Sequence, residues 1–180
     1  SRAREEAVSN GIDPNVAEKI MSLLIESSLT NQERDRVAAE GKGDGRTVLV
    51  IGGLGKMGGW FVNFFRSQGF ETDVADRQVA PGPGEFRDWA ETSLNYDIIV
   101  VATPLAVSAR ILSELAVHQP EALIFDIGSL KTPLRQGLRD LLDAGCKVTS
   151  LHPMYGPGTE LLSGRHLIFV DVGDSRATAE

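Results

Sequence analysis

The feature that most constrains the fold of this chain is a regular alternation of short apolar runs with amphipathic stretches. The runs are rich in Val, Ile and Leu, as expected of strands buried on both faces. They cover residues 47–51, 72–75, 98–102, 122–126, 147–151 and 166–170, and the stretches at 56–67, 86–93, 105–117 and 131–143 are predicted helices. This order predicts right-handed βαβ crossovers, and therefore an α/β fold on a doubly wound, mostly parallel sheet.

One long helix is predicted ahead of this region, over residues 14–36, with Asp13 as its cap. Apolar positions and one serine recur there at helical spacing: Val16, Ile20, Leu23, Leu24 and Ser27. Residues 37–46 are rich in glycine and polar side chains, which predicts a linker. The sequence thus predicts a helical segment over 1–36, a linker, and an α/β domain over 47–180.

Composition and charge exclude several classes of function. With 180 residues, 42% of them hydrophobic and 24% charged, the chain has ordinary globular composition. A formal net charge of −7 argues against a nucleic-acid or anionic-membrane partner. No apolar run approaches the roughly 20 residues of a membrane span, and the first residues do not form a secretory signal. One cysteine, Cys146, excludes an internal disulfide, so we expect a cytoplasmic protein.

A glycine-rich loop follows the first apolar run. A dinucleotide pyrophosphate needs backbone N–H groups directed at it, with no side chains in the way. Gly53 is expected to allow the tight turn, Gly55 to let the backbone approach the phosphates, and Gly58 to let the helix approach its strand. The positive end of that helix would face the anion. The candidate cofactor contacts are Gly53, Leu54, Gly55, Lys56, Met57 and Gly58; the alternative is a glycine-rich turn without a ligand.

Asp76 ends the second run, 23 residues after Gly53. An acid there can bond both ribose hydroxyls and would repel a 2′-phosphate, which favours NAD over NADP. Arg77 could instead pair with a 2′-phosphate or lie against the adenine. Thr103 and Pro104 follow the third run, where we expect them beside the bound cofactor. The alternatives are a carboxylate that bonds a nearby turn, and an ordinary strand-to-helix turn.

Two polar residues are candidates for the substrate at the same sheet edge. Ser129 follows the fourth run and could hydrogen-bond there. His152 comes at the end of the fifth run, in a loop rich in Gly and Pro, and imidazole can take a proton from an alcohol as hydride leaves. The alternatives are helix capping by Ser129, a solvated Lys131 and a structural histidine. His118 and His166 are expected to be structural, and no metal site is expected.

Residues 47–172 resemble the NAD-binding domain of prephenate dehydrogenases, enzymes of tyrosine biosynthesis. The matching pieces are V-I-G-G-L-G-K-M-G-G, the Asp76-Arg77 pair, A-T-P, D-I-G-S-L-K and L-H-P-M-Y-G-P. The resemblance implies oxidative decarboxylation of prephenate to 4-hydroxyphenylpyruvate, with His152 bonded to the ring hydroxyl and Ser129 holding it near the nicotinamide. It also implies a homodimer, formed through a helical domain that would follow residue 180.

Residues 1–36 resemble the end of an all-helical chorismate mutase, a domain fused ahead of the dehydrogenase in the bifunctional T-protein type. The resemblance is carried by Gly11-Ile12-Asp13-Pro14 and by the stretch from Leu24 to Gln32. It implies that Gln32 bonds the ether oxygen of chorismate, with Ser28 one turn earlier. Since the other mutase helices are absent, the chain is expected to lack mutase activity, to bind NAD, and to turn over prephenate poorly.

Several alternatives stay open at this point. Arogenate dehydrogenase is a close variant that nothing in the sequence separates from the prephenate enzyme. A methyltransferase would use the same glycine loop for an adenosyl cofactor, although His152-Pro153-Met154 weighs against it. A nucleotide-binding module without catalysis would use residues 14–36 only to pair with a partner helix. A β-hydroxyacid dehydrogenase usually has a lysine in place of the histidine.

Overall fold

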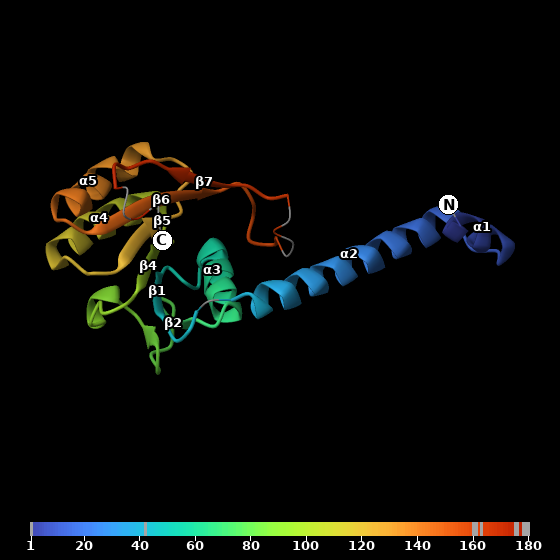
Figure 1. Ribbon diagram of the computed structural model, residues 1–180, viewed down its shortest axis with the longest axis horizontal. Helices are drawn as coiled ribbons and strands as arrows, with labels where there is room; N and C mark the ends of the chain where they lie inside the picture. The colour runs from blue at the N-terminus through green and yellow to red at the C-terminus, as the bar shows by residue number, and fades with distance from the viewer. Residues whose placement is uncertain (1, 42, 160–161, 163, 175–176, 178–180) are drawn as a thin grey trace.

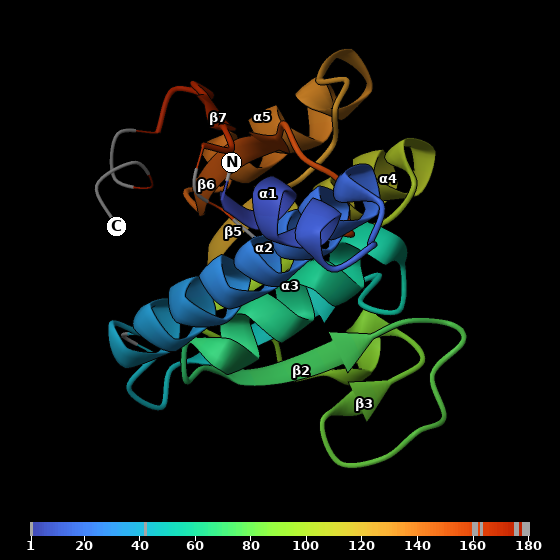
Figure 2. The ribbon, with the colours of Figure 1, turned by 90° about the vertical axis from the view of Figure 1, so that its right-hand side faces the viewer.

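The molecule consists of an α/β body and a helical arm that projects from it (Figure 1). The computed structural model describes residues 2–41, 43–159, 162, 164–174 and 177. We call the described residues from 43 onward the α/β body, and helices α1 (Arg2–Ser9) and α2 (Pro14–Ala39) the helical arm. Figure 2 views the molecule from the side of the arm, with α1 nearest the viewer.

A seven-stranded sheet forms the centre of the α/β body. Its strands are β1 (Thr47–Ile51), β2 (Glu71–Ala75), β3 (Glu85–Phe86), β4 (Ile98–Val101), β5 (Leu123–Asp126), β6 (Lys147–Pro153) and β7 (Leu167–Val170). They lie in the order β3-β2-β1-β4-β5-β6-β7, and all neighbours are parallel except β6 and β7. The strand order reverses between β1 and β4, which confirms the predicted doubly wound sheet.

Both faces of the sheet are covered, because alternate residues of each strand point to opposite sides. The helices of the body are α3 (Lys56–Ser67), α4 (Leu105–His118) and α5 (Arg135–Asp143), with the 3-10 turns η1 (Trp89–Glu91) and η2 (Thr132–Leu134). On one face Val48 and Val50 pack with residues of α3. On the other face Leu49 packs in a cluster formed largely by α4 and α5. This two-sided burial explains why the strands read as continuous apolar runs.

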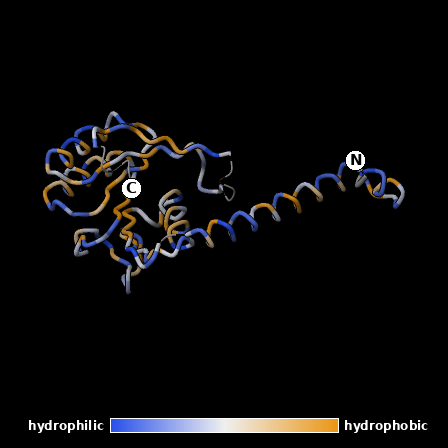
Figure 3. Tube along the Cα trace, viewed as in Figure 1, coloured by the Kyte–Doolittle hydropathy of each residue, from blue (hydrophilic) through white to orange (hydrophobic). Residues whose placement is uncertain are grey.

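Helix α2 begins as the sequence predicts, whereas α1 was not predicted as a separate helix. The Asp13 carboxylate accepts a hydrogen bond from the backbone N–H of Asn15 at 2.8 Å, which caps α2. Helix α2 continues to Ala39 and so takes up the first residues of the predicted linker; the first glycine of that segment is Gly41. Most of the apolar side chains of α2 are exposed. The trace coloured by hydropathy in Figure 3 has separate hydrophobic segments along the arm. None of the described helices combines the length and the apolar character of a membrane span.

The predicted helix over 86–93 is wrong. This stretch contains the end of β3 and the single turn η1. The backbone N–H of Asp76 donates to the carbonyl of Phe86 at 2.9 Å. The segment therefore pairs with the edge of β2 as a strand of the sheet. The Asp88 carboxylate accepts a hydrogen bond from the backbone N–H of Ala90 and caps one turn only, because the backbone is already extended at Thr92, with φ −86° and ψ 158°.

Candidate cofactor and substrate site

The glycine-rich loop joins β1 to α3, and its residues Gly52, Gly53 and Gly58 have no room for a side chain. Gly52 has φ 87°, in the left-handed region that favours glycine, and a Cβ there would lie 2.8 Å from the carbonyl oxygen of Ala102. The tight turn therefore falls on Gly52, one residue before the glycine predicted for it. Gly53 instead packs against Val74, whose Cγ1 would be 2.7 Å from an added Cβ. At Gly58 a Cβ would overlap the carbonyl oxygen of Gly52, so α3 lies directly on the loop.

Two hydrogen bonds hold this loop in place beside the start of α3. The backbone N–H of Gly55 donates to the carbonyl of Gly52 at 3.0 Å, and that of Leu54 donates to the Asp76 carboxylate at 3.2 Å. Helix α3 begins at Lys56, followed by Met57, and Gly55 provides no side-chain cap. The first turn of a helix leaves N–H groups without intrahelical partners at its positive end. A glycine-rich loop at such an end fits a pyrophosphate.

A cavity of about 640 Å³ lies beside the loop, at the carboxyl ends of β1, β2 and β4, where the strand order reverses. This volume is in the range of small-molecule sites. Of the predicted cofactor contacts, Gly55, Asp76, Arg77, Thr103 and Pro104 line it. Residues that the sequence analysis did not single out also line it, namely Gly52, Arg87, Trp89, Arg110 and Glu114. Arg87 and Trp89 were not predicted as cofactor contacts because their segment was predicted to be a helix.

The polar groups at the cavity wall already have protein partners. Asp76 accepts hydrogen bonds from the backbone N–H groups of Leu54 and Gln78, as in the alternative of a carboxylate that bonds a nearby turn. Each carboxylate oxygen can accept a second hydrogen bond, so ribose hydroxyls still fit. Thr103 Oγ1 lies 2.8 Å from Ser108 Oγ, which also bonds the Thr103 carbonyl. These contacts fix the turn that leads through Pro104 into α4.

The two predicted substrate residues lie at the same edge of the sheet, outside the lining of this cavity. His152 lies within β6 rather than in a loop after it, because β7 pairs with β6 and extends it; Ile168 is opposite His152. His152 is half-buried, whereas Ser129 is exposed, three residues after β5. Neither η2 nor α5 takes a side-chain cap, which excludes the capping role for Ser129.

A buried ion pair joins the segments that carry these two residues. The side chain of Asp126, at the end of β5, is fully buried. Lys131 Nζ donates to Asp126 Oδ1 at 2.7 Å and to the carbonyl of Leu151 at 2.7 Å. Burial lowers the pKa of Lys131, against the opposing effect of the Asp126 carboxylate. The alternative of a solvated Lys131 is therefore wrong.

The predicted mutase residues are separate from this edge. Ser28 and Gln32 are both exposed on α2, and neither lines a described cavity. Among the described residues, no group of three His, Cys, Asp or Glu side chains could hold a metal ion. The predicted mutase residues and the residues predicted at the sheet edge therefore form two separate sets in the described structure.

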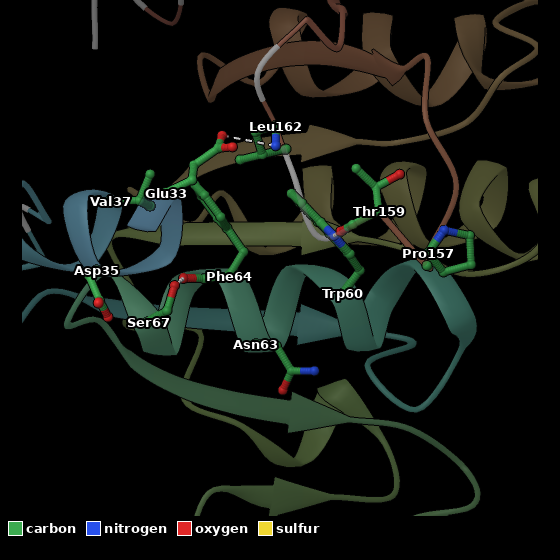
Figure 4. Close-up of a pocket in the computed structure, with 11 residues that line it drawn as sticks. Glu33, Asp35, Val37, Trp60, Asn63, Phe64, Ser67, Pro157, Thr159 and Leu162 are labelled. Carbon is green, nitrogen blue, oxygen red and sulfur yellow. Dashed lines mark hydrogen bonds between the residues drawn. The ribbon is translucent and has the colours of Figure 1, made fainter. Parts of the chain in front are cut away.

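A second cavity, of about 530 Å³, lies at the base of the arm between α2, α3 and the segment that follows His152 (Figure 4). Trp60 Nε1 donates to the carbonyl of Thr159 at 2.9 Å, and the Glu33 carboxylate accepts from the backbone N–H of Leu162 at 2.9 Å. The Trp60 ring also contacts that of Tyr155, with centroids 5.0 Å apart. The sequence analysis missed this junction because its residues are far apart along the chain.

The sequence was compared with family models, curated proteins and solved structures. The model of the family described as "Prephenate dehydrogenase, nucleotide-binding domain" matches residues 77–177, more than half of the chain. A protein of Methanocaldococcus jannaschii named "Probable arogenate/prephenate dehydrogenase" is 30% identical over 125 residues, which cover 64% of this chain and 28% of that protein. The family model begins after the glycine-rich loop.

Two curated relatives also match the arm. The protein named "T-protein" of Enterobacter agglomerans is 25% identical over 93% of this chain and 43% of its own length. The "T-protein" of Haemophilus influenzae is 28% identical over 85% of this chain and 38% of its own length. The chain thus spans less than half the length of each curated relative described here.

One solved structure supports the fold. It is a Corynebacterium glutamicum protein described as a "putative prephenate dehydrogenase", with a TM-score of 0.50 and 23% sequence identity. The match covers 61% of this chain and 37% of that one. At this identity the likeness concerns the fold alone.

Proposed function

This chain belongs to the prephenate dehydrogenase family, and on that premise we propose that it supplies the NAD-binding domain of an enzyme that converts prephenate to 4-hydroxyphenylpyruvate. The observation that carries the proposal is the loop at residues 52–58, where Gly52, Gly53 and Gly58 leave no room for a side chain of their own and which opens on a cavity bounded by Asp76. The family's nucleotide-binding domain implies a nicotinamide cofactor. The choice of NAD rests on Asp76, which would bond the ribose hydroxyls and repel a 2′-phosphate.

Different residues of the α/β body would bind different parts of the cofactor. The backbone of the loop and of the first turn of α3 would face the pyrophosphate at Gly53, Leu54, Gly55, Lys56, Met57 and Gly58. Since the N–H groups of Leu54 and Gly55 already donate to Asp76 and Gly52, these two residues would contribute close approach of the backbone. Arg77 would lie against the adenine, on the outer side of Asp76. Thr103 and Pro104 would border the nicotinamide at the end of β4. The alternative in which Arg77 binds a 2′-phosphate makes the opposite prediction for NADP.

The proposed chemistry assigns His152 as the base. When bound, the nicotinamide accepts hydride from the carbon that bears the substrate hydroxyl. His152 takes the proton of that hydroxyl, since a neutral imidazole can act as a general base. Ser129 holds the same hydroxyl by a hydrogen bond. Loss of carbon dioxide then restores the aromatic ring and makes the step irreversible. Arogenate, which has an amine where prephenate has a keto group, is the alternative substrate, and rates with both would separate them.

For the complete protein we infer a second function and an assembly. Residues 1–36 would be the end of a chorismate mutase domain, with Ser28 and Gln32 facing chorismate, and 37–46 would connect it to the cofactor-binding domain at 47–180. The two relatives named T-protein support this reading of the arm. We also infer a cytoplasmic homodimer. The chain studied alone is expected to lack mutase activity and to oxidise prephenate slowly or not at all.

Titration calorimetry of this chain with NAD, and with NADP in parallel, tests the cofactor proposal. We expect NAD to bind at least about tenfold more tightly than NADP, a difference of about 1.4 kcal/mol. Asp76→Ala should reduce that preference, because the carboxylate no longer repels the 2′-phosphate. Arg77→Ala is the matched variant, and it should leave the preference for NAD unchanged. If neither NAD nor NADP binds, the cofactor assignment is contradicted.

A further inference from the structure

We propose that the buried ion pair of Asp126 and Lys131 positions the proposed substrate residues, by fixing the end of β6 that carries His152 relative to the turn that carries Ser129. This inference rests on the proposed function, in which those two residues hold the substrate hydroxyl. Asp126 and Lys131 are positioning residues in this proposal, since both act through the backbone of their neighbours.

Asp126 is the centre of the arrangement. Its carboxylate accepts hydrogen bonds from three directions: the backbone N–H of Gly128 at 2.8 Å, the hydroxyl of Ser150, and Lys131 Nζ. Gly128 directly precedes Ser129, and Ser150 lies on β6, two residues before His152. One buried side chain therefore holds both the turn after β5 and the neighbouring strand.

Lys131 makes the second connection. Its ammonium donates to Asp126 and also to the carbonyl of Leu151, which is the carbonyl of the peptide bond that leads into His152. A peptide unit is planar, so fixing its oxygen also restricts where the next Cα lies. Lys131 thereby fixes the backbone from which the imidazole extends. An apolar side chain of similar length, such as that of methionine, could fill the same space but could not donate this bond.

The turn between the two charged residues is itself closely packed. A Cβ at Gly128 would lie 2.8 Å from side-chain atoms of both Leu105 and Leu134, and 3.2 Å from Asp126 Oδ1. The backbone before Ser129 therefore has little freedom of its own. Motion of Ser129 relative to His152 would have to come from a shift between β5 and β6, and the ion pair opposes that shift.

Packing alone does not account for charges at this position. Taking a carboxylate and an ammonium out of water costs free energy that their attraction often only offsets, and replacing such a pair by apolar residues is often neutral for stability. A charged pair that also reaches a main-chain carbonyl does something that apolar residues cannot do. It fixes the geometry at one position of the backbone, and that position is adjacent to His152.

Nuclear magnetic resonance of the histidine rings tests this inference in the intact chain. The chain has three histidines, and His118, on α4, serves as the internal reference for His152. In Lys131→Met we expect the His152 ring cross-peak to shift and broaden, while that of His118 stays in place. Lys131→Arg keeps a cationic donor, so its His152 cross-peak should lie close to the wild-type position. Lys147→Met, at the other end of β6, is the matched control and should leave it unchanged.

A second variant covers the case in which Lys131→Met fails to fold because the Asp126 charge is left buried. The double variant Asp126→Asn with Lys131→Met removes both charges; it should fold, and its His152 cross-peak should still be displaced, because the bond to Leu151 is missing. A His152 cross-peak at the wild-type position in the folded double variant would overturn the inference. NAD binding is measured on the same samples and should stay within about twofold, since the glycine-rich loop is at another strand. If the wild-type chain does not bind NAD, the proposed function is contradicted, whereas the position of the His152 cross-peak still tests the role of the ion pair.

Discussion

Apolar side chains have opposite environments in the α/β body and in the helical arm. Leu112 on α4 is completely buried, whereas Leu24 on α2 is 60% exposed. Both are leucines within helices of regular apolar spacing. The difference shows that a local pattern specifies a helix but not its partner. The body buries its helices because the strands between them supply a second apolar surface, and the described residues offer no such surface along most of α2.

The largest expected effect separates the two regions by stability. Leu112→Ala removes a fully buried side chain, so we expect it to lower the free energy of unfolding by about 3 kcal/mol. Leu24→Ala is the matched variant in the arm and should change it by less than about 0.5 kcal/mol. Urea unfolding followed by circular dichroism measures both. A cost at Leu24 close to that at Leu112 would show that the arm is buried in solution.

The second prediction compares two neighbouring glycines in the body. At Gly58 a Cβ would overlap the carbonyl of Gly52, whereas at Gly59 it would make an ordinary contact 3.4 Å from the carbonyl of Gly53. Gly58→Ala should displace α3 from the loop and weaken NAD binding at least about tenfold. Gly59→Ala should leave the affinity nearly unchanged. Equal affinities for the two variants would mean that close packing of helix and loop is not needed for the cofactor.

The third prediction concerns the pH dependence of stability at the start of the sheet. The backbone N–H of Thr47 donates to the Asp97 carboxylate at 2.7 Å, and this bond is the main cause that lowers the pKa of Asp97 below its ordinary 3.8. A carboxyl whose pKa is lowered by folding stabilises the folded state above its unfolded pKa, and this contribution is lost as pH falls through the folded value. Asp97→Ala should therefore lower the melting temperature at pH 7, and the difference from wild type should shrink below pH 4. A difference that is constant with pH would contradict this assignment.

The smallest expected effect lies at the beginning of the arm. Asp13→Ala removes the bond to the Asn15 N–H and should destabilise α2 by about 1 kcal/mol. Since the body does not depend on that cap, its melting transition should stay in place. Far-ultraviolet circular dichroism measures the loss of helix, and Asp13→Asn, which keeps a capping oxygen, should restore it. A parallel loss of the body's transition would show that arm and body unfold together.

Elements whose structure depends on local residues could be predicted from the sequence, and elements whose structure depends on residues far along the chain could not. Strand β1 and helix α3 were predicted with their observed ends, because periodicity and glycine placement are local properties. The segment 86–93 has apolar residues at helical spacing, but its structure is decided by the edge of β2. His152 was placed in a loop for the same reason, since the partner that extends β6 is β7, some fifteen residues further along the chain.

The candidate site shows the same division. The loop, Asp76 and the Thr103-Pro104 turn were found because each follows a strand directly. The partnership of Lys131 with Asp126 and Leu151 could not be read from spacing, since Leu151 lies 20 residues away on another strand. Arg110 and Glu114 border the cofactor cavity only because α4 begins there. Long-range contacts of this kind need the tertiary structure.

The loop that borders the proposed cofactor cavity is held in place by contacts within the protein. Gly55 bonds Gly52, Leu54 bonds Asp76, and α3 lies on the turn without space between them. Binding to such a surface requires little loss of protein conformational entropy, so most of the entropic cost falls on the ligand. Association should then be a single docking step, with a rate constant that depends on encounter rather than on rearrangement of the loop.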